Sequence, residues 1–157
     1  MQPTVAEVKP LLNAMLQRYS ATGYAGQFQL HQRGDMFHVV PISRRSENGQ
    51  DVSYDAILST ELSFAPTEEK SALEALQGLT EDLQRFTGVT VLVGTVPTNL
   101  LNQTKFVESG GFGSARSQLI RILASTGQRL SWRLLYGPND PVRFVLNVHM
   151  VPPVGSN

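Results

Sequence analysis

Residues 73–96 read LEALQGLTEDLQRFTGVTVLVGTV, and this stretch carries the clearest helix and strand signals of the chain. Its first half repeats leucine every three or four residues, which predicts a helix with one buried face that begins at Thr67 as N-cap. Thr87-Gly88 closes the pattern, because glycine readily takes the left-handed conformation that ends helices. The β-branched run from Val89 to Val96 then predicts a strand covered on both faces.

Similar signals occur near both ends of the chain. A helical pattern over residues 3–20 leads into Thr22-Gly23 and a hairpin pattern, which ends in His38-Val39-Val40-Pro41. A second helical pattern leads into Thr126-Gly127 and another hairpin, which ends in His149-Met150-Val151-Pro152. These signals suggest an internal helix–hairpin repeat, and independent selection of two similar units is the alternative.

The predicted order of elements is α-β-β-β-α-β-β-α-β-β. We therefore expect an α+β fold with three helices packed on small mixed or antiparallel sheets. Residues 1–50 form a helix plus β-hairpin extension, and residues 51–153 form a β-α-β-β-α-β-β domain packed with it. We expect residues 154–157 to be a flexible tail. Residues 43–51, 98–102 and 109–113 are predicted as loops or turns, and Ser114 as the N-cap of the last helix.

Composition narrows the classes of function. Thirteen basic and thirteen acidic residues cancel, which argues against nucleic-acid binding through bulk charge. From Gly111 onward, the sequence contains five arginines but a single acidic residue, Asp140. We interpret this local excess of positive charge as a solvated basic face. The chain has no cysteine, so disulfides and thiolate nucleophiles are excluded. No apolar run approaches the roughly 18 residues that a membrane span needs, so we expect no membrane insertion.

The second part of the chain carries a resemblance. Its motifs are the leucine-rich helix followed by Thr87-Gly88 and Val89-Thr90-Val91-Leu92-Val93, and QLIRIL at 118–123 followed by LSWRL at 130–134. Residues 57–151 thereby resemble the short N-terminal signalling and docking domains of secretins and TonB-dependent receptors, which run β-α-β-β-α-β-β. The resemblance implies a protein-interaction module of the cell envelope, and it carries over no catalytic residues. The first 50 residues have no counterpart in that family.

His31 and His38 are the candidate metal ligands. The turn signal Gly34-Asp35 places them opposite each other on the outer face of the first hairpin, with Leu30 and Val39 on the inner face. Two imidazoles can bind a metal when a third ligand joins them, and His149 is the candidate if the two hairpins are adjacent. The alternative is a pair of solvated strand histidines. We identify no catalytic residue and no cofactor.

These observations favour a non-enzymatic binding module, with a protein partner, in the periplasm or cell envelope of a bacterium. A cytoplasmic location is the alternative, since no signal peptide is visible. Such a domain can bind by adding a strand to an exposed sheet edge, for which the strand expected at 57–64 is the first place to look. The alternative function is a small-ligand or metal-binding protein that uses a cleft between the two repeat-like halves. Partner identity and oligomeric state lie beyond the sequence.

Overall fold

A computed structural model describes residues 5–22, 26–34, 36–46, 48–137 and 140–152. The chain divides into two compact units, one up to Ala56 and one from Ile57 onward. Helices and strands both contribute and the sheets are small, so the α+β class is confirmed. The predicted tail at 154–157, Gly23 and Asp35 lie outside the described residues.

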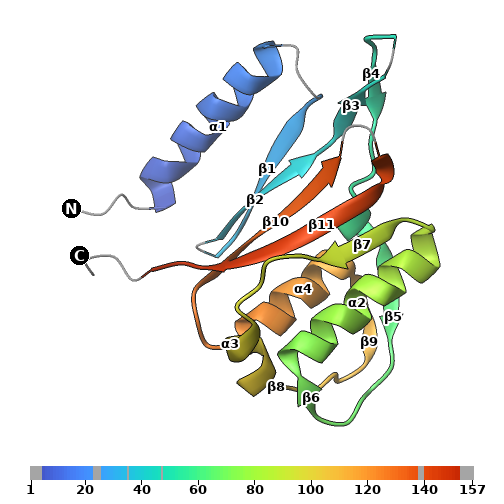
Figure 1. The fold of residues 1–157 in the computed structure, drawn as a ribbon. Coiled ribbons are helices and arrows are strands. Elements are labelled where there is room, and N and C mark those ends of the chain that lie inside the picture. The colour runs from blue at the N-terminus through green and yellow to red at the C-terminus, as the bar shows by residue number, and fades with distance from the viewer. Residues whose placement is uncertain (1–4, 23–25, 35, 47, 138–139, 153–157) are drawn as a thin grey trace. The chain divides into compact units, whose positions relative to one another are not determined.

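The first unit is a helix followed by two small hairpins (Figure 1). Tyr19 of the helix meets Phe28 edge to face, with ring centres 5.5 Å apart, and this contact holds the helix against the first hairpin. Residues 43–51, predicted as a loop, instead contribute strands to a second hairpin. The elements are α1 (Val5–Ala21), β1 (Phe28–Arg33), β2 (Met36–Pro41), β3 (Ser43–Arg45) and β4 (Asp51–Ser53).

The second unit contains the β-α-β-β-α-β-β order with additions. Its elements are η1 (Ile57–Ser59), β5 (Glu61–Phe64), β6 (Lys70–Ser71), α2 (Ala72–Thr87), β7 (Thr90–Val93), α3 (Thr98–Gln103), β8 (Lys105–Phe106), β9 (Gly111–Ser114), α4 (Ala115–Ala124), β10 (Leu130–Gly137) and β11 (Asp140–Met150). Helix α3 replaces the turn predicted at 98–102, and β9 replaces part of the loop predicted at 109–113. Only the second half of the strand predicted over 57–64 forms a strand, β5, because the first residues form the short helix η1.

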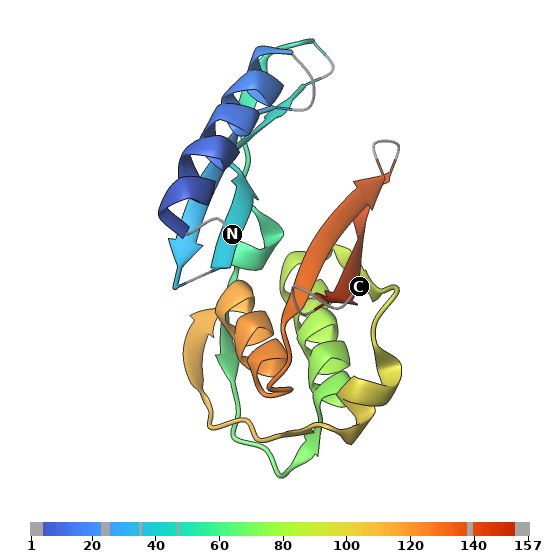
Figure 2. The same ribbon diagram turned by 90° about the vertical axis from the view of Figure 1, so that its left-hand side faces the viewer.

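The core of the second unit lies between two sheets. Strands β10, β11 and β7 form one sheet, in which β10–β11 is antiparallel and β11–β7 is parallel. Helices α2 and α4 pack against each other beneath it, and the antiparallel β5–β9 pair lies on their other side (Figure 2). Leu76 of α2, Leu119 and Ile122 of α4 and Leu146 of β11 are almost completely buried in this core.

Local signals explain where the two main helices begin and end. The N-cap of α2 is Ser71 rather than the predicted Thr67, and Ser71 and Glu74 form a reciprocal capping box. Gly88 ends the helix with φ 69°, as predicted. Ser114 caps α4 by accepting a hydrogen bond from the Ser117 N–H, also as predicted. Phe86 lies at helical spacing from Leu79 and Leu83, yet it is 63% exposed whereas both leucines are buried.

Candidate functional site

The candidate site is the free edge of the three-stranded sheet in the second unit. Strand β10 is eight residues long and pairs with β11 on one side only. Within the described residues, no strand pairs with its other side. Strand β10 contains no proline, and its one register irregularity lies at its far end, between Tyr136 and Gly137. Its middle is therefore open to pairing with another strand.

The direction of the ladder hydrogen bonds shows which backbone groups face this edge. The Val151 N–H donates to the Arg129 carbonyl at 2.8 Å, so Arg129 points its backbone groups toward β11. Because the direction alternates along a strand, the N–H and C=O groups of Leu130 and Leu134 point away from β11. These groups are available as a template for an added strand.

The outer face of the same sheet is partly apolar. Leu135, Val145 and Leu92 are register neighbours across β10, β11 and β7, and they form one row on the side away from the helices. Leu135 is 52% exposed and Leu92 is 47% exposed. Arg133 and Arg143 lie on the two sides of this row. An exposed apolar row that continues to an open strand edge is a feature of protein-docking surfaces.

A second arginine approaches β10 from the inner side. The guanidinium of Arg116, on the first turn of α4, lies 6.0 Å from the centre of the Trp132 ring. Its Nη1 atom is buried and has no hydrogen-bond partner within the described residues. Burial lowers the pKa of this guanidinium, because removal from water disfavours its charged form. The arrangement leaves a buried, unsatisfied donor beneath the edge strand.

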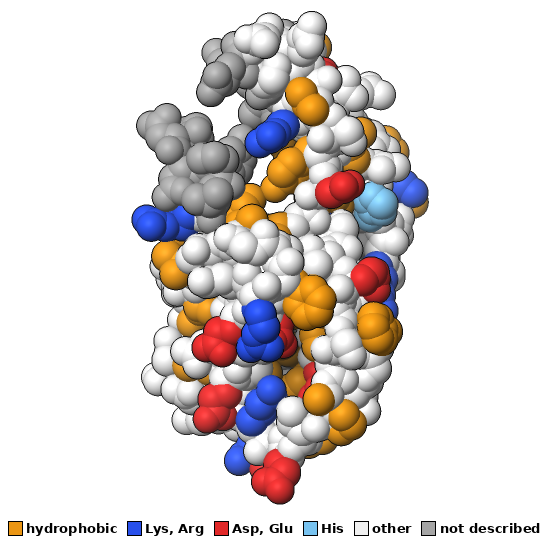
Figure 3. Space-filling model, turned by 90° about the vertical axis from the view of Figure 1, so that its right-hand side faces the viewer, with side chains coloured by type: hydrophobic (Ala, Val, Ile, Leu, Met, Phe, Trp, Pro, Cys, Tyr) orange, Lys and Arg blue, Asp and Glu red, His pale blue; other side chains and the backbone are white. Residues whose placement is uncertain are grey.

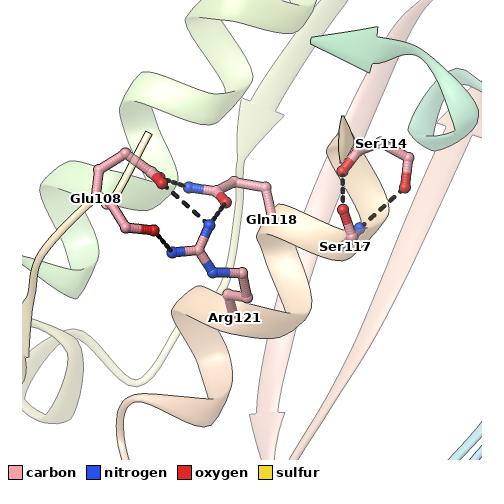
Figure 4. Close-up of polar contacts among 6 residues, drawn as sticks. Glu108, Ser114, Ser117, Gln118 and Arg121 are labelled. Atoms are coloured by element: carbon pink, nitrogen blue, oxygen red, sulfur yellow. Dashed lines mark hydrogen bonds and ion pairs between the residues drawn. The ribbon is translucent and has the colours of Figure 1, made fainter. Parts of the chain in front are cut away.

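A buried polar cluster holds the chain before β9 against α4 (Figure 4). The carboxylate of Glu108 accepts hydrogen bonds from the side-chain amide of Gln118 and, at 3.0 Å, from Arg121. Arg121 also donates to the Ser109 hydroxyl at 3.1 Å and lies over the ring of Phe106. Because these groups satisfy one another, the cluster serves to position residues 105–110 on α4.

The two candidate metal ligands are register partners, as predicted, since His31 pairs with His38 across the first hairpin. The prediction that both lie on an exposed face is wrong, because His38 is only 7% exposed while Val39 is 47% exposed. Within the described residues, no group of three or more His, Asp or Glu side chains is placed to bind a metal ion. His149 belongs to the other unit, is exposed, and pairs with Ser131, so its surroundings differ from those of His38.

Elsewhere on the surface, charges of both signs are mixed. Figure 3 shows basic and acidic side chains interspersed over one face of the molecule, with hydrophobic side chains in separate groups. Two exposed ion pairs of the second unit, Arg85–Asp82 and Lys105–Glu69, belong to this mixture. In the described part of the chain, no helix is both long enough and apolar enough to cross a membrane.

The chain matches no protein-family model, and no curated protein or solved structure shows significant similarity to it.

The sequence predicted a hairpin that ends in His149-Met150-Val151-Pro152 but did not identify its first strand, β10, as a sheet edge. Nothing in the alternation of Leu130, Trp132 and Leu134 indicates that one side of the strand has no neighbour. The one sequence feature that relates to this edge is the excess of arginine after Gly111, for which the prediction was a solvated basic face. Two of these arginines, Arg116 and Arg133, lie on opposite sides of the open strand.

Proposed function

We propose that this protein is a non-enzymatic binding module of the bacterial cell envelope, which binds a partner protein by adding a strand of that partner to β10. The single observation that carries the proposal is the eight-residue strand β10 with one side unpaired among the described residues. Backbone hydrogen bonds supply affinity in such a complex, and alternate side chains supply specificity.

The edge expected from the sequence is a poorer candidate. Strand β5 has only four residues, and β7, at the other edge of the three-stranded sheet, also has four. A longer edge offers more ladder hydrogen bonds, each of which contributes about 0.5–1.5 kcal/mol net. Length therefore favours β10 over the other edges of this unit.

The cell-envelope location rests on the resemblance of residues 57–151 to secretin and TonB-dependent receptor N-terminal domains. With the two-residue strands β6 and β8 and the short helix α3 set aside, the order is β5-α2-β7-β9-α4-β10-β11, which supports this part of the proposal because that family runs β-α-β-β-α-β-β. The balance of thirteen basic and thirteen acidic residues supports a protein partner over a nucleic acid.

The absence of cysteine from the chain allows a direct test. In one variant, Leu135→Cys on the edge strand β10 carries a photoreactive cross-linker. In the matched control, the same cross-linker is attached at Gln84→Cys, an exposed position of α2. Both labelled proteins are illuminated with a native bacterial envelope fraction, and adducts are identified by mass spectrometry. We expect a defined adduct from position 135 that is missing from position 84. Equal labelling at both positions, or no adduct, contradicts the proposal.

Hydrogen exchange provides a second measurement on the identified complex. In the free protein, the Leu134 amide should exchange rapidly, whereas the Arg133 amide is bonded to β11 and should exchange slowly. Binding of a strand at the edge slows exchange at Leu134. Protection confined to other elements shows that the partner binds elsewhere.

A further inference from the structure

Both faces of the open strand carry positive charge. Arg133 lies at the middle of β10 on the outer face, is exposed, and forms no ion pair within the described residues. The other described side chains of this face contain arginine and histidine but no carboxylate. They are Ser131, Leu135, Arg143, Val145, Asn147, His149, Thr90 and Leu92.

The inner face has its own unmatched cation. The buried Nη1 of Arg116 lacks a hydrogen-bond partner in the described part of the chain, and its guanidinium stacks near Trp132. A buried donor without a partner costs about 1–3 kcal/mol, and more when the group is charged. A carboxylate at this position would remove that cost and gain a charge-assisted hydrogen bond.

Consecutive residues of a strand point to opposite faces, so Trp132 and Arg133 mark opposite sides of the same short segment of β10. A strand added beside them also alternates. We infer that the segment bound at β10 is an extended acidic peptide of a partner protein, in which two consecutive acidic residues face Arg133 on one side and Arg116 on the other. This inference rests on the proposed function and specifies the chemistry of the partner.

A second copy of this chain fits the edge less well. Two β10 strands paired about their centres would bring the Arg133 side chains of both copies onto the same face. Like charges on neighbouring strands are destabilising. The charge of the edge therefore favours an acidic partner over self-association.

The test uses the full chain and three synthetic peptides. The first is a capped octapeptide of sequence TVTEETVT, and its matched controls replace the central EE by QQ or KK. Trp132 is the only tryptophan of the chain and lies at the edge strand, so its fluorescence reports binding. We expect the EE peptide to bind at least tenfold more tightly than QQ, the KK peptide to bind most weakly, and added salt to weaken the EE complex.

Two variants locate the charges that matter. Arg133→Glu, at an exposed position, should weaken the EE peptide at least tenfold and restore binding of the KK peptide. Arg116→Gln should weaken the EE peptide at least fivefold, with its folding checked by circular dichroism. The control Arg85→Glu makes the same charge change as Arg133→Glu at a side chain that is 72% exposed on α2, and should leave affinity unchanged.

Failure of this inference is distinguishable from failure of the proposed function. Equal affinity for EE and QQ, or tighter binding of KK, overturns the acidic partner while site-specific cross-linking at position 135 can still stand. Self-association of the unmodified protein that slows exchange at the Leu134 amide assigns the edge to a second copy and also overturns it. Absence of both cross-linking and peptide binding overturns the two proposals together.

Discussion

Replacement of Glu108 by glutamine tests what holds the second unit together. The Glu108 side chain is 5% exposed, and its two oxygens accept hydrogen bonds from Gln118 and Arg121. Glutamine keeps the size of the side chain but turns one acceptor into a donor. That new N–H group then faces a donor of Arg121 or Gln118 in a buried site. The substitution also removes the charge that neutralises the guanidinium.

The magnitude follows from burial. Breaking a fully buried ion pair by removing one partner costs about 3–5 kcal/mol. The Arg121 side chain is 42% exposed, so it can turn partly toward water and recover some hydration. One lost charge-assisted hydrogen bond costs about 1.5–3 kcal/mol. We therefore expect Glu108→Gln to lower the free energy of unfolding by about 2–3 kcal/mol, in the upper part of the hydrogen-bond range and below the cost of breaking a fully buried pair.

Urea unfolding followed by Trp132 fluorescence measures this change, since the only tryptophan lies in the second unit. With a urea m-value of about 1.5 kcal/mol/M, a loss of about 2 kcal/mol lowers the midpoint by about 1.3 M. The control is Arg85→Met, which removes the exposed Arg85–Asp82 pair and should cost under about 1 kcal/mol. A double-mutant cycle with Arg121→Met should show a coupling of about 1 kcal/mol or more.

The interpretation of the cluster is refuted by two results. One is a change for Glu108→Gln no larger than that of the Arg85→Met control. The other is strict additivity of the Glu108 and Arg121 substitutions, because groups in one hydrogen-bonded network are coupled. The first result would mean that the contacts of Glu108 contribute little beyond those made with water, and the second would mean that Glu108 and Arg121 do not act as one network.

Three further predictions concern single positions. Ser71→Ala removes the side-chain half of the α2 capping box and should cost about 1 kcal/mol in thermal or urea unfolding, and Ser71→Asn, another strong N-cap residue, is the control. Hydrogen bonds from the Ser71 backbone and side chain lower the pKa of Glu74 from 4.5, so its contribution is present above that pH and is lost as pH falls. Stability of the unmodified protein should therefore decrease more steeply below pH 4.5 than that of Glu74→Gln, and parallel curves would contradict this. Gly94→Ala should destabilise the second unit measurably, because an added Cβ would lie 2.4 Å from Asn147 Oδ1 and 2.6 Å from Val145 Cγ1; unchanged urea unfolding would show that these side chains move aside freely.

The elements that sequence predicted best are those whose signals are local. Helix α2 follows from the leucine spacing and from Gly88, and α4 follows from Ser114 and its own apolar stripe. The register of the first hairpin followed from a two-residue turn, which alone determines that His31 faces His38. In each of these, the residues that carry the signal are neighbours in the chain.

The errors occurred where long-range pairing outweighs local preference. Residues 111–113 are rich in glycine and belong to the loop predicted at 109–113, yet with Ser114 they form β9 because β5 supplies the hydrogen-bond partners. Residues 98–103 form α3 although no apolar repeat of sufficient length indicates a helix, and Leu101 is buried against the core. The burial of His38 likewise could not be predicted from its register, because register does not state which face of a hairpin is covered.

Sequence alone predicted the α+β class, the two main helices, the end of α2 at Gly88, the Ser114 cap of α4, and the hairpin that follows α4. It determined these because periodicity, glycine and capping residues act over a few positions of the chain. The open edge of β10, and the positions of Arg116 and Arg133 on its two faces, follow from the folded arrangement and from no local signal in the sequence. An edge is defined by the neighbour that a strand lacks, and the folded arrangement of the described chain is what reveals it.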